Sequence, residues 1–224
     1  MENTLDLIIV NNKEKNNINN DILKTLKPGG YIFSFDVQSK AHNSVCDIED
    51  IGFLIKDSIS YFFKENEDIK QDVICLAMKP LSEKNFAENV MKWGTGGLNI
   101  GKTRIKIRDD VNLDSLQKNF NSMGYDGSYT CVENINKYNS EGRFPSNFII
   151  SEDIAPVLDG QNKEASRFFK NVDSYKDLLK YITVMGLPPK KGKVLFIGFN
   201  NAEEIIEEIN NENCTSYEVV GGMN

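Results

Sequence analysis

The residues of this chain that could bind a charged or nucleotide-like ligand lie in two glycine-containing turns. In the first, Lys193–Asn201 (Lys-Val-Leu-Phe-Ile-Gly-Phe-Asn-Asn), apolar residues run through Gly198 into a polar turn, and a helix is predicted over Ala202–Ile209. In an open α/β sheet, a turn between a strand and a helix can hold a nucleotide-like cofactor against the helix N-terminus. The sequence therefore predicts a candidate cofactor turn around Gly198.

The second turn, Gly96–Thr103 (Gly-Gly-Leu-Asn-Ile-Gly-Lys-Thr), satisfies the P-loop pattern GxxxxGK[ST]. A P-loop needs a buried strand before the turn and a helix after it, since backbone amides and the helix N-terminus together hold the phosphates. Here Glu88–Trp93 is helical and polar in pattern, and Arg104–Arg108 alternates like a strand. Phosphate binding through Lys102 is one interpretation, and a structural glycine-rich turn is the other.

A concentration of basic residues overlaps this second turn and includes the sole tryptophan. The set consists of Lys92, Trp93, Lys102, Arg104, Lys106 and Arg108. Positive side chains beside an aromatic ring are typical of a contact with the DNA backbone. The alternative is a solvated strand face whose charge is balanced by Asp109 and Asp110. Both interpretations stay open at the level of the sequence.

Composition narrows the class of protein. An apolar fraction of 40% is ordinary for a protein with a hydrophobic core. The formal charge of -7 argues against a non-specific nucleic-acid binder, so any contact with DNA needs a local basic patch. The four cysteines form no CxxC pair and His42 is the only histidine, so no metal site is predicted. No basic leader and no apolar run of about 18 residues is present, which predicts a cytoplasmic protein without a membrane span.

Apolar runs and turn residues predict an α/β protein with a mostly parallel sheet and some antiparallel pairing. Lys27–Gly30 (Lys-Pro-Gly-Gly) is expected to end a helix, and Lys64–Gln71 is expected to be a charged loop. Strands are predicted over 5–10, 31–35, 53–55, 59–63, 73–78, 147–150, 193–197 and 216–220, and helices over 21–26, 43–51, 86–93, 112–123, 174–185 and 202–209. Residues 1–81 and 147–224 are expected to form the core, with an irregular insertion at 82–146 that contacts DNA or a partner.

Several segments, taken in order, resemble the phage and prophage DNA methyltransferases that modify adenine N6 or cytosine N4, in their permuted motif order. These segments are Asp6–Val10, Leu26–Tyr31, Ile51–Phe53, Cys75–Leu81, Ala87–Val90, Gly94–Ile100, Gly142–Asn147 and Ser166–Phe169. Together they cover nearly the whole chain, and Arg143, Arg167 and Phe169 match family positions. The resemblance implies a Rossmann-like, S-adenosylmethionine-dependent methyltransferase fold, with the strand before Gly198 at the cofactor.

The resemblance also implies a catalytic loop after the first strand, of the form Asp/Asn-Pro-Pro-Tyr/Trp. Its side chain and backbone carbonyl orient the target amino group, and its aromatic residue stacks on a flipped-out base. The loop position here holds Asn11-Asn12-Lys13-Glu14. Asn11 could supply the amide, but both prolines and the aromatic residue are missing, and a plain loop asparagine is the other interpretation.

The cofactor motifs implied by the resemblance are also altered. The family pattern Asp-Pro-Phe-x-Gly-x-Gly is matched only by Gly198, and Phe199 could fill the space meant for the cofactor. Asn171–Asp173 stands where the family has His-Pro-Thr-x-Lys-Pro. Glu218 ends a strand about twenty residues past the turn, where the family's acidic residue holds the ribose. A solvent-facing glutamate is the alternative for Glu218.

From these motifs we expect a DNA methyltransferase-like protein that is catalytically inactive and acts by binding. It would be the partner of an active methyltransferase, or a phage-encoded decoy or regulator that contacts DNA or a host protein, in the cytoplasm of a bacterial host. No cofactor is expected, unless the site is still open to S-adenosylmethionine. The alternatives are an active but divergent adenine-N6 or cytosine-N4 methyltransferase that uses Asn11, and a nucleotide-binding protein that uses the 96–103 loop.

Overall fold

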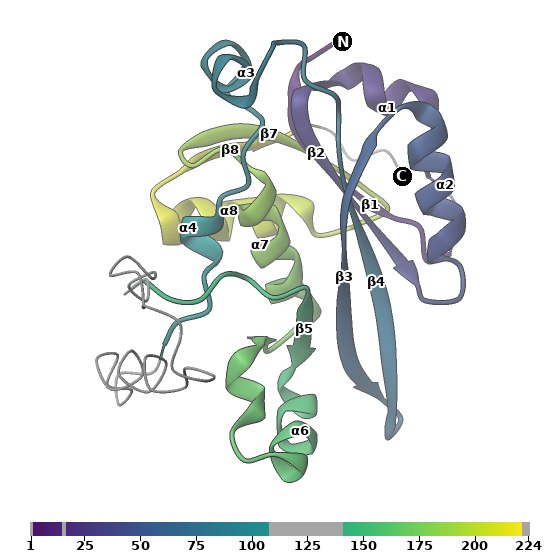
Figure 1. Cartoon of the computed structure of the whole chain (residues 1–224), viewed down its shortest axis with the longest axis vertical. Coiled ribbons are helices and arrows are strands. Elements are labelled where there is room, and N and C mark those ends of the chain that lie inside the picture. The colour runs from purple at the N-terminus through teal and green to yellow at the C-terminus, as the bar shows by residue number, and fades with distance from the viewer. Residues whose placement is uncertain (1, 15–16, 108–140, 221–224) are drawn as a thin grey trace, which may run out of the picture.

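The strands of the protein assemble into one eight-stranded sheet. The computed structural model describes residues 2–14, 17–107 and 141–220. In these residues the strand order is β6-β5-β3-β4-β2-β1-β7-β8 (Figure 1). The strands are β1 (Leu5–Asn11), β2 (Leu26–Val37), β3 (Leu54–Glu65), β4 (Asp68–Met78), β5 (Phe148–Ser151), β6 (Lys170–Val172), β7 (Lys191–Ile197) and β8 (Ser216–Val219).

One strand of the sheet, β4, runs antiparallel to both of its neighbours, β2 and β3. The other neighbouring pairs are parallel: β1 with β2 and β7, β3 with β5, β5 with β6, and β7 with β8. The predicted α/β class, with a mostly parallel Rossmann-like sheet and some antiparallel pairing, is confirmed. Because β1, β2, β7 and β8 are parallel, their carboxyl ends define one edge of the sheet and their amino ends the opposite edge.

Helices cover both faces of this sheet (Figure 1). They are α1 (Asn20–Thr25), α2 (Ala41–Ile51), α3 (Phe86–Trp93), α4 (Ile100–Thr103), α6 (Ala155–Gln161), α7 (Tyr175–Gly186) and α8 (Ala202–Asn213), with two short 3-10 turns at Glu152–Ile154 and Ala165–Phe168. Alternate residues of β1 belong to two separate core clusters: Leu7 and Ile9 pack with α7 and α8, and Ile8 and Val10 pack with α1 and α2. Burial on both faces explains why β1 is a continuous apolar run.

Helix α7 is the central helix of one layer. It begins where the Ser174 hydroxyl accepts a hydrogen bond from the Asp177 amide at 3.2 Å. It ends at Gly186, where a Cβ atom would lie 2.6 Å from a methyl of Leu7 and 2.7 Å from the ring of Phe33. Glycine at this position therefore lets the helix approach the sheet, and the predicted helix over 174–185 is confirmed.

The structure corrects the prediction for Lys27–Gly30. Helix α1 already ends at Thr25, and Lys27–Gly30 belong to β2. They form an irregularity in the pairing of β2 with β1: Leu5 pairs with Leu26, and Leu7 pairs with Tyr31. The segment stays in the sheet because Gly29 donates to the Lys79 carbonyl at 3.0 Å and Lys79 donates to the Gly30 carbonyl at 2.9 Å. Residues that are typical of a turn therefore form a bulge within a strand here.

The two predicted strands at 53–55 and 59–63 are one strand, β3, and the predicted charged loop Lys64–Gln71 is mostly strand. Asn66 and Glu67 form the turn of a hairpin, with φ values of 51° and 68°. The charged sequence predicted a loop because this end of the hairpin extends past the core, so that its side chains face solvent on both sides. The predicted helix over 112–123 lies outside the described residues.

None of the helices in the described part of the chain has the length and apolar character to cross a bilayer.

Candidate functional site

Parallel pairing of β1 and β7 brings Asn11 and Gly198 together at the carboxyl edge of the sheet. The Asn11 amide nitrogen donates a hydrogen bond to the Gly198 carbonyl at 3.2 Å. Gly198 has a φ of 76°, and a Cβ atom there would lie 3.2 Å from both the Cβ and the carbonyl oxygen of Asn11. Two of the predicted site residues therefore lie in contact, and the cofactor turn is closed against the loop that follows β1.

The remaining polar groups of Asn11 are bonded within the same loop. Its backbone carbonyl accepts a hydrogen bond from the Asn17 amide at 2.6 Å, and its side-chain oxygen accepts one from the Lys13 backbone at 3.2 Å. The carbonyl and the amide are the two groups that a methyltransferase loop of the resembled family would offer to a target amino group. In this arrangement each of the two oxygens already accepts one hydrogen bond from within the loop.

The side chain of Phe199 turns toward the interior of the molecule. Its ring makes edge-on contacts with Phe35, with the centroids 5.8 Å apart, and with Phe196, at 5.9 Å. It is partly buried against the core cluster that includes α7 and α8. Edge-on aromatic contacts add stability beyond the burial of area. Phe199 therefore acts as a core residue.

A cavity of about 510 Å³ is present on the outer side of the turn, and Phe199, Asn200, Ala202, Glu203 and Val219 are among the residues that line it. Its volume is within the range of small-molecule sites. Both of its charged side chains, Glu203 and Glu204, are carboxylates in the first turn of α8. The cavity is therefore a shallow acidic hollow outside the turn.

Glu218 is in β8, in register with Lys193 of β7, and its carboxylate lies 3.3 Å from the Lys193 ammonium. Gly198 is five positions further along β7 and the turn, about 16 Å away at the rise of a strand. Glu218 is not among the residues that line the cavity beside Phe199. The structure therefore separates Glu218 from Asn11 and Gly198.

Polar residues that the sequence did not single out fix the loop after β1. The Asn12 amide donates to the Ser34 hydroxyl at 2.8 Å and to the Ser44 hydroxyl at 3.4 Å, and Ser34 donates to Asp36 at 3.3 Å. Burial raises the pKa of the Asp36 carboxyl, and the hydrogen bonds from Ser44, Ser34 and Asn12 act in the opposite direction. No spacing rule could have found this cluster, because its members come from three elements.

Lys13 occupies the space beyond Asn11. Its ammonium forms an ion pair with the buried Asp72 and lies 4.6 Å from the centroid of the Tyr175 ring. Burial raises the pKa of Asp72, while the hydrogen bond and charge of Lys13 lower it. In the resembled family a stacking aromatic residue is expected in this loop, and here a lysine bound to an internal carboxylate follows Asn11 instead.

The predicted basic set is divided between two places. Lys92 and Trp93 are on α3, where Lys92 pairs with Glu83 at 2.6 Å and the Trp93 ring nitrogen donates to Ser82 at 2.8 Å. Figure 1 shows α3 well separated from α4, which carries Lys102. The members of the set that the structure describes therefore do not form one continuous surface, and Arg108 lies outside the described residues.

Near α4, the structure brings together a predicted basic residue, Lys102, and a lysine that was not in the predicted set, Lys170. Lys102 and Lys170 line the same small cavity of about 250 Å³. Burial lowers the pKa of the Lys170 ammonium; the nearby carboxylates of Asp173 and Asp177 act in the opposite direction, and the charge of Lys106 adds a smaller lowering. Arg104 has a structural role, since its guanidinium donates to the Gly142 carbonyl at 3.1 Å. The basic group near α4 thus consists of Lys102, Lys106 and Lys170.

The glycine-rich turn at 96–103 lacks the strand that a P-loop requires before it, because α3 precedes it. Its glycines instead approach the bulge of β2: a Cβ at Gly29 would lie 3.1 Å from the Gly96 Cα. The Tyr31 hydroxyl donates to the Gly96 carbonyl at 2.8 Å, and the Thr95 hydroxyl donates to the Pro28 carbonyl at 2.7 Å. The structure supports the interpretation as a structural turn.

Across the described ranges, no group of three or more histidine, cysteine, aspartate or glutamate side chains is arranged to hold a metal ion.

No protein-family model matches the chain, and no curated protein matches it by sequence. Solved structures similar to it include M1.HpyAVI, with a TM-score of 0.49 and 9% identity over 99% of this chain and 82% of that chain. The SAM complex of M1.HpyAVI has a TM-score of 0.47 and 10% identity over the same shares. PvuII DNA methyltransferase (cytosine-N4-specific) has a TM-score of 0.48 and 11% identity, over 99% of this chain and 75% of that chain. At these identities the likeness concerns the fold alone.

Proposed function

We propose that this protein is a DNA methyltransferase-like protein that does not transfer methyl groups and acts by binding. Its partner would be an active methyltransferase, a host protein or DNA. The observation that carries the proposal is the contact between Asn11 and Gly198, which joins the catalytic position and the cofactor position of the resembled family. A site that binds a substrate between two loops needs those loops to be separate.

Two further observations support the loss of catalysis. Phe199 packs against Phe35 and Phe196 in the core, and residues 198–201 (Gly-Phe-Asn-Asn) contain neither a second glycine nor an acidic residue. The carbonyl of Asn11 already accepts the Asn17 amide at 2.6 Å. Because catalysis depends on groups that are preorganised and free to stabilise the transition state, a bonded carbonyl at this position contributes little to the reaction.

Calorimetry with S-adenosylmethionine tests this proposal. We expect no binding tighter than about 100 μM, which corresponds to roughly 5.5 kcal/mol. Asn200→Trp fills the hollow beside Phe199, and Asn211→Trp places the same side chain on an exposed part of α8 outside that hollow. Binding below 100 μM that disappears in Asn200→Trp and persists in Asn211→Trp would contradict the proposal.

The acidic hollow of about 510 Å³ favours a second candidate, an active but divergent adenine-N6 or cytosine-N4 methyltransferase. In that case the cofactor would lie outside Phe199 and the Asn11 contact would open on binding. Transfer of a labelled methyl group from S-adenosylmethionine to duplex DNA, lost in Asn11→Ala, would establish this candidate. We expect no label above background with either protein.

The binding role is tested by co-expression with candidate active methyltransferases, followed by size-exclusion chromatography of the purified components. A stoichiometric complex, or DNA binding that depends on the basic group near α4, would support the proposal. If neither is found with methyltransferases, host proteins or DNA, the binding role is wrong, whatever the outcome for S-adenosylmethionine.

A further inference from the structure

A further cavity opens at the amino edge of the sheet, opposite the edge that carries Gly198. It has a volume of about 720 Å³, within the range of small-molecule sites. Asp6, Lys191 and Ser216, which line it, stand at or next to the amino ends of β1, β7 and β8. It is therefore independent of the cofactor turn, and nothing inferred about methyl transfer assigns a role to it.

The walls of this cavity combine apolar surface with an aromatic ring. Pro188 and Pro189, just before β7, form part of the wall, and Trp93 at the end of α3 forms another part. The orientation of the indole ring is fixed, because its nitrogen donates to the Ser82 hydroxyl at 2.8 Å. A partly exposed indole held in this way offers a flat surface on which a planar ring can stack.

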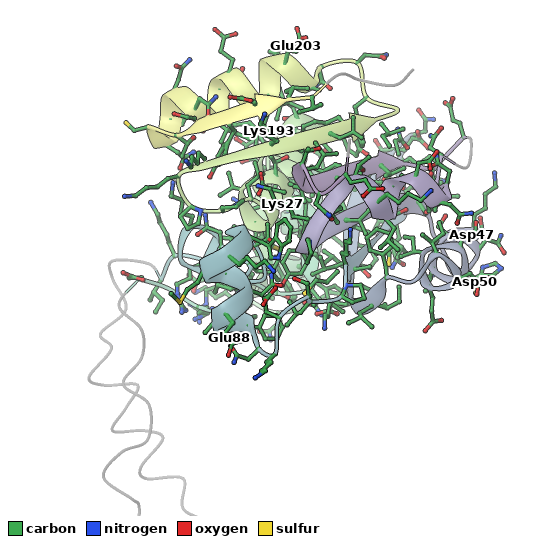
Figure 2. All side chains as sticks on the ribbon, turned by 90° about the horizontal axis from the view of Figure 1, so that it is seen from above. Lys27, Asp47, Asp50, Glu88, Lys193 and Glu203 are labelled. Atoms are coloured by element: carbon green, nitrogen blue, oxygen red, sulfur yellow. The ribbon has the colours of Figure 1, made fainter. Side chains whose placement is uncertain are left out.

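The charges around the cavity are mostly positive. Four lysines line it, against two carboxylates. The buried carboxylate of Asp6 is already neutralised, since it accepts the Lys27 ammonium at 2.6 Å and the Lys193 backbone amide at 2.7 Å. Figure 2, seen from above, shows Lys193 on the β7–β8 side of the sheet and Lys27 between that side and α3.

Two of the lysines are available for a ligand. The Lys193 ammonium lies 3.3 Å from the Glu218 carboxylate, whereas Lys190 and Lys191 are exposed and form no ion pair within the described residues. In a chain with a formal charge of -7, two neighbouring unpaired lysines at the mouth of a cavity create a local positive field. An anionic group of a ligand would be attracted to this position.

We propose that the amino-edge cavity binds a small nucleotide, with its phosphates at Lys190 and Lys191 and its base against Trp93. A purely apolar ligand would leave the lysines unused, and a bare inorganic anion would leave the indole and proline surfaces unused. A nucleotide combines an anionic group with a planar ring and fits both walls. The lysines act as point charges that hold phosphate without a glycine-rich loop.

Intrinsic fluorescence gives a direct test, because Trp93 is the only tryptophan of the chain. Titration with ADP is expected to change the emission of Trp93 saturably, with a dissociation constant below about 1 mM. Lys190→Glu/Lys191→Glu is expected to raise that constant at least tenfold. The control is Lys56→Glu/Lys163→Glu, which changes the net charge equally at exposed positions outside the cavity and is expected to leave the constant unchanged.

Each other outcome would overturn the proposal. An absent or non-saturating response to ADP, or a response unchanged in Lys190→Glu/Lys191→Glu, would exclude the cavity. Pyrophosphate binding as tightly as ADP would exclude the ring contact, and adenosine binding as tightly would exclude the phosphate contact. A single-stranded oligonucleotide binding more tightly than ADP would assign the surface to nucleic acid instead. Circular dichroism melting checks that the variants fold, and Lys190→Ala/Lys191→Ala replaces the charge reversal if they do not.

Discussion

At the scale of single residues, Asn11 and Phe199 determine how the carboxyl edge of the sheet is used. The Asn11 amide ties the loop after β1 to the Gly198 carbonyl, and the Phe199 ring fills the interior side of the turn. Under the proposed function, these two contacts stand where a methyl-transfer site of the resembled family would need separate loops. Closure of the turn thus comes from the side chains themselves, with no change in the order of the strands.

The carboxyl group of Asp36 gives the protein a pH-dependent stability. Burial raises the pKa of Asp36 above its ordinary value of 3.8. Between 3.8 and the raised value, the folded state binds more protons than the unfolded state, so stability falls as pH rises through this window. Above the raised pKa the carboxylate is charged in both states, and the stability lost through this window is then fully absent.

We expect Asp36→Asn to raise the free energy of unfolding at pH 7, and we expect the difference from the wild type to shrink as the pH falls to about 4. Urea unfolding between pH 4 and pH 8 measures both effects. Asp50→Asn, at an exposed position of α2, controls for the loss of one negative charge. An equal loss of stability at pH 4 and pH 7 in Asp36→Asn would show that hydrogen bonding outweighs charge at this position.

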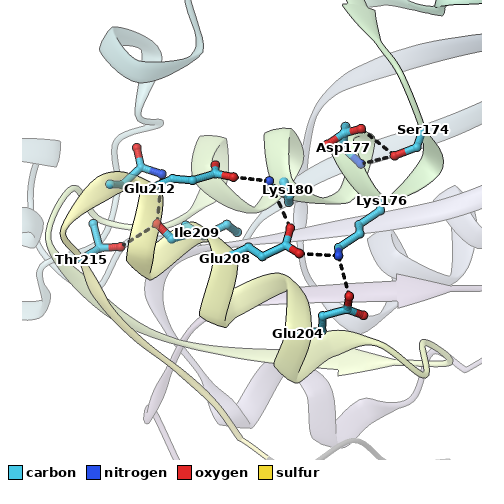
Figure 3. A network of polar contacts seen from close by, with 10 residues as sticks. Ser174, Lys176, Asp177, Lys180, Glu204, Glu208, Ile209, Glu212 and Thr215 are labelled. Carbon is cyan, nitrogen blue, oxygen red and sulfur yellow. Dashed lines mark hydrogen bonds and ion pairs between the residues drawn. The ribbon is translucent and has the colours of Figure 1, made fainter.

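At the scale of elements, α7 and α8 are joined by a ladder of ion pairs (Figure 3). Lys176 contacts Glu204 at 2.7 Å and Glu208 at 2.5 Å, and Lys180 contacts Glu208 at 3.2 Å and Glu212 at 2.5 Å. The hydrogen bonds that Lys176 donates to Glu204 and, second, to Glu208 raise the pKa of Lys176. Glu208 belongs to both halves of the ladder, so it is the position at which one substitution breaks the network.

Glu208→Gln is expected to lower the midpoint of urea unfolding at low ionic strength, and the loss is expected to diminish in about 1 M NaCl, where charges at the surface are screened. The matched control is Glu207→Gln, the neighbouring exposed residue, which forms no ion pair in the described part of the chain. Salt-independent destabilisation of Glu208→Gln would mean that packing, and not charge, holds the two helices together.

Sequence patterns predicted the elements that have strong periodicity. They failed where the bounds of a strand depend on its pairing with a distant part of the chain. The helix at 86–93 and the buried strand at 5–10 follow from local residues alone. Lys27–Gly30 was predicted as the turn that ends a helix before a strand at Tyr31, but it belongs to β2, because its place there depends on hydrogen bonds to Lys79, far along the chain. Local turn chemistry carries no information on such a partner.

The same reasoning applies to the candidate site. Adjacent parallel strands place Asn11 beside Gly198, but the hydrogen bond that closes the turn depends on side-chain packing that no spacing reveals. The position of Glu218 depends on the length of α8. This helix runs about 18 Å back toward the amino edge, so β8 starts beside Lys191 and Glu218 pairs with Lys193. Lys190 and Lys191 could have been noticed from the run Pro188–Lys193 (Pro-Pro-Lys-Lys-Gly-Lys).

At the scale of the whole molecule, the formal charge of -7 makes long-range attraction to DNA unfavourable, so DNA contact depends on a local cluster. The group near α4 is the candidate, with Lys102 and Lys170 at one cavity and Lys106 close to Lys170. Because only a few phosphates can be neutralised there, affinity should fall with salt at a slope of roughly -0.9 per phosphate contacted.

Fluorescence anisotropy with a labelled duplex tests this expectation. Lys102→Glu/Lys106→Glu is expected to weaken binding at least tenfold and to reduce the salt slope. Lys56→Glu/Lys163→Glu, with the same change in net charge, is expected to have a small effect. Equal losses in both double variants would indicate that net charge alone governs binding, and unchanged affinity in both would exclude this cluster.

The position of Phe199 also affects how the fold responds to its chemical surroundings. When a ligand binds at the edge of a sheet in the folded state only, it raises the free energy of unfolding by RT ln(1 + [L]/Kd). The stability of such a protein therefore changes with the concentration of that ligand in the cell. Here the ring that packs against Phe35 and Phe196 belongs to the chain itself, as the side chain of Phe199. If the protein binds no cofactor, as proposed, the contribution of these contacts to stability stays constant when the metabolite pool is depleted or replenished.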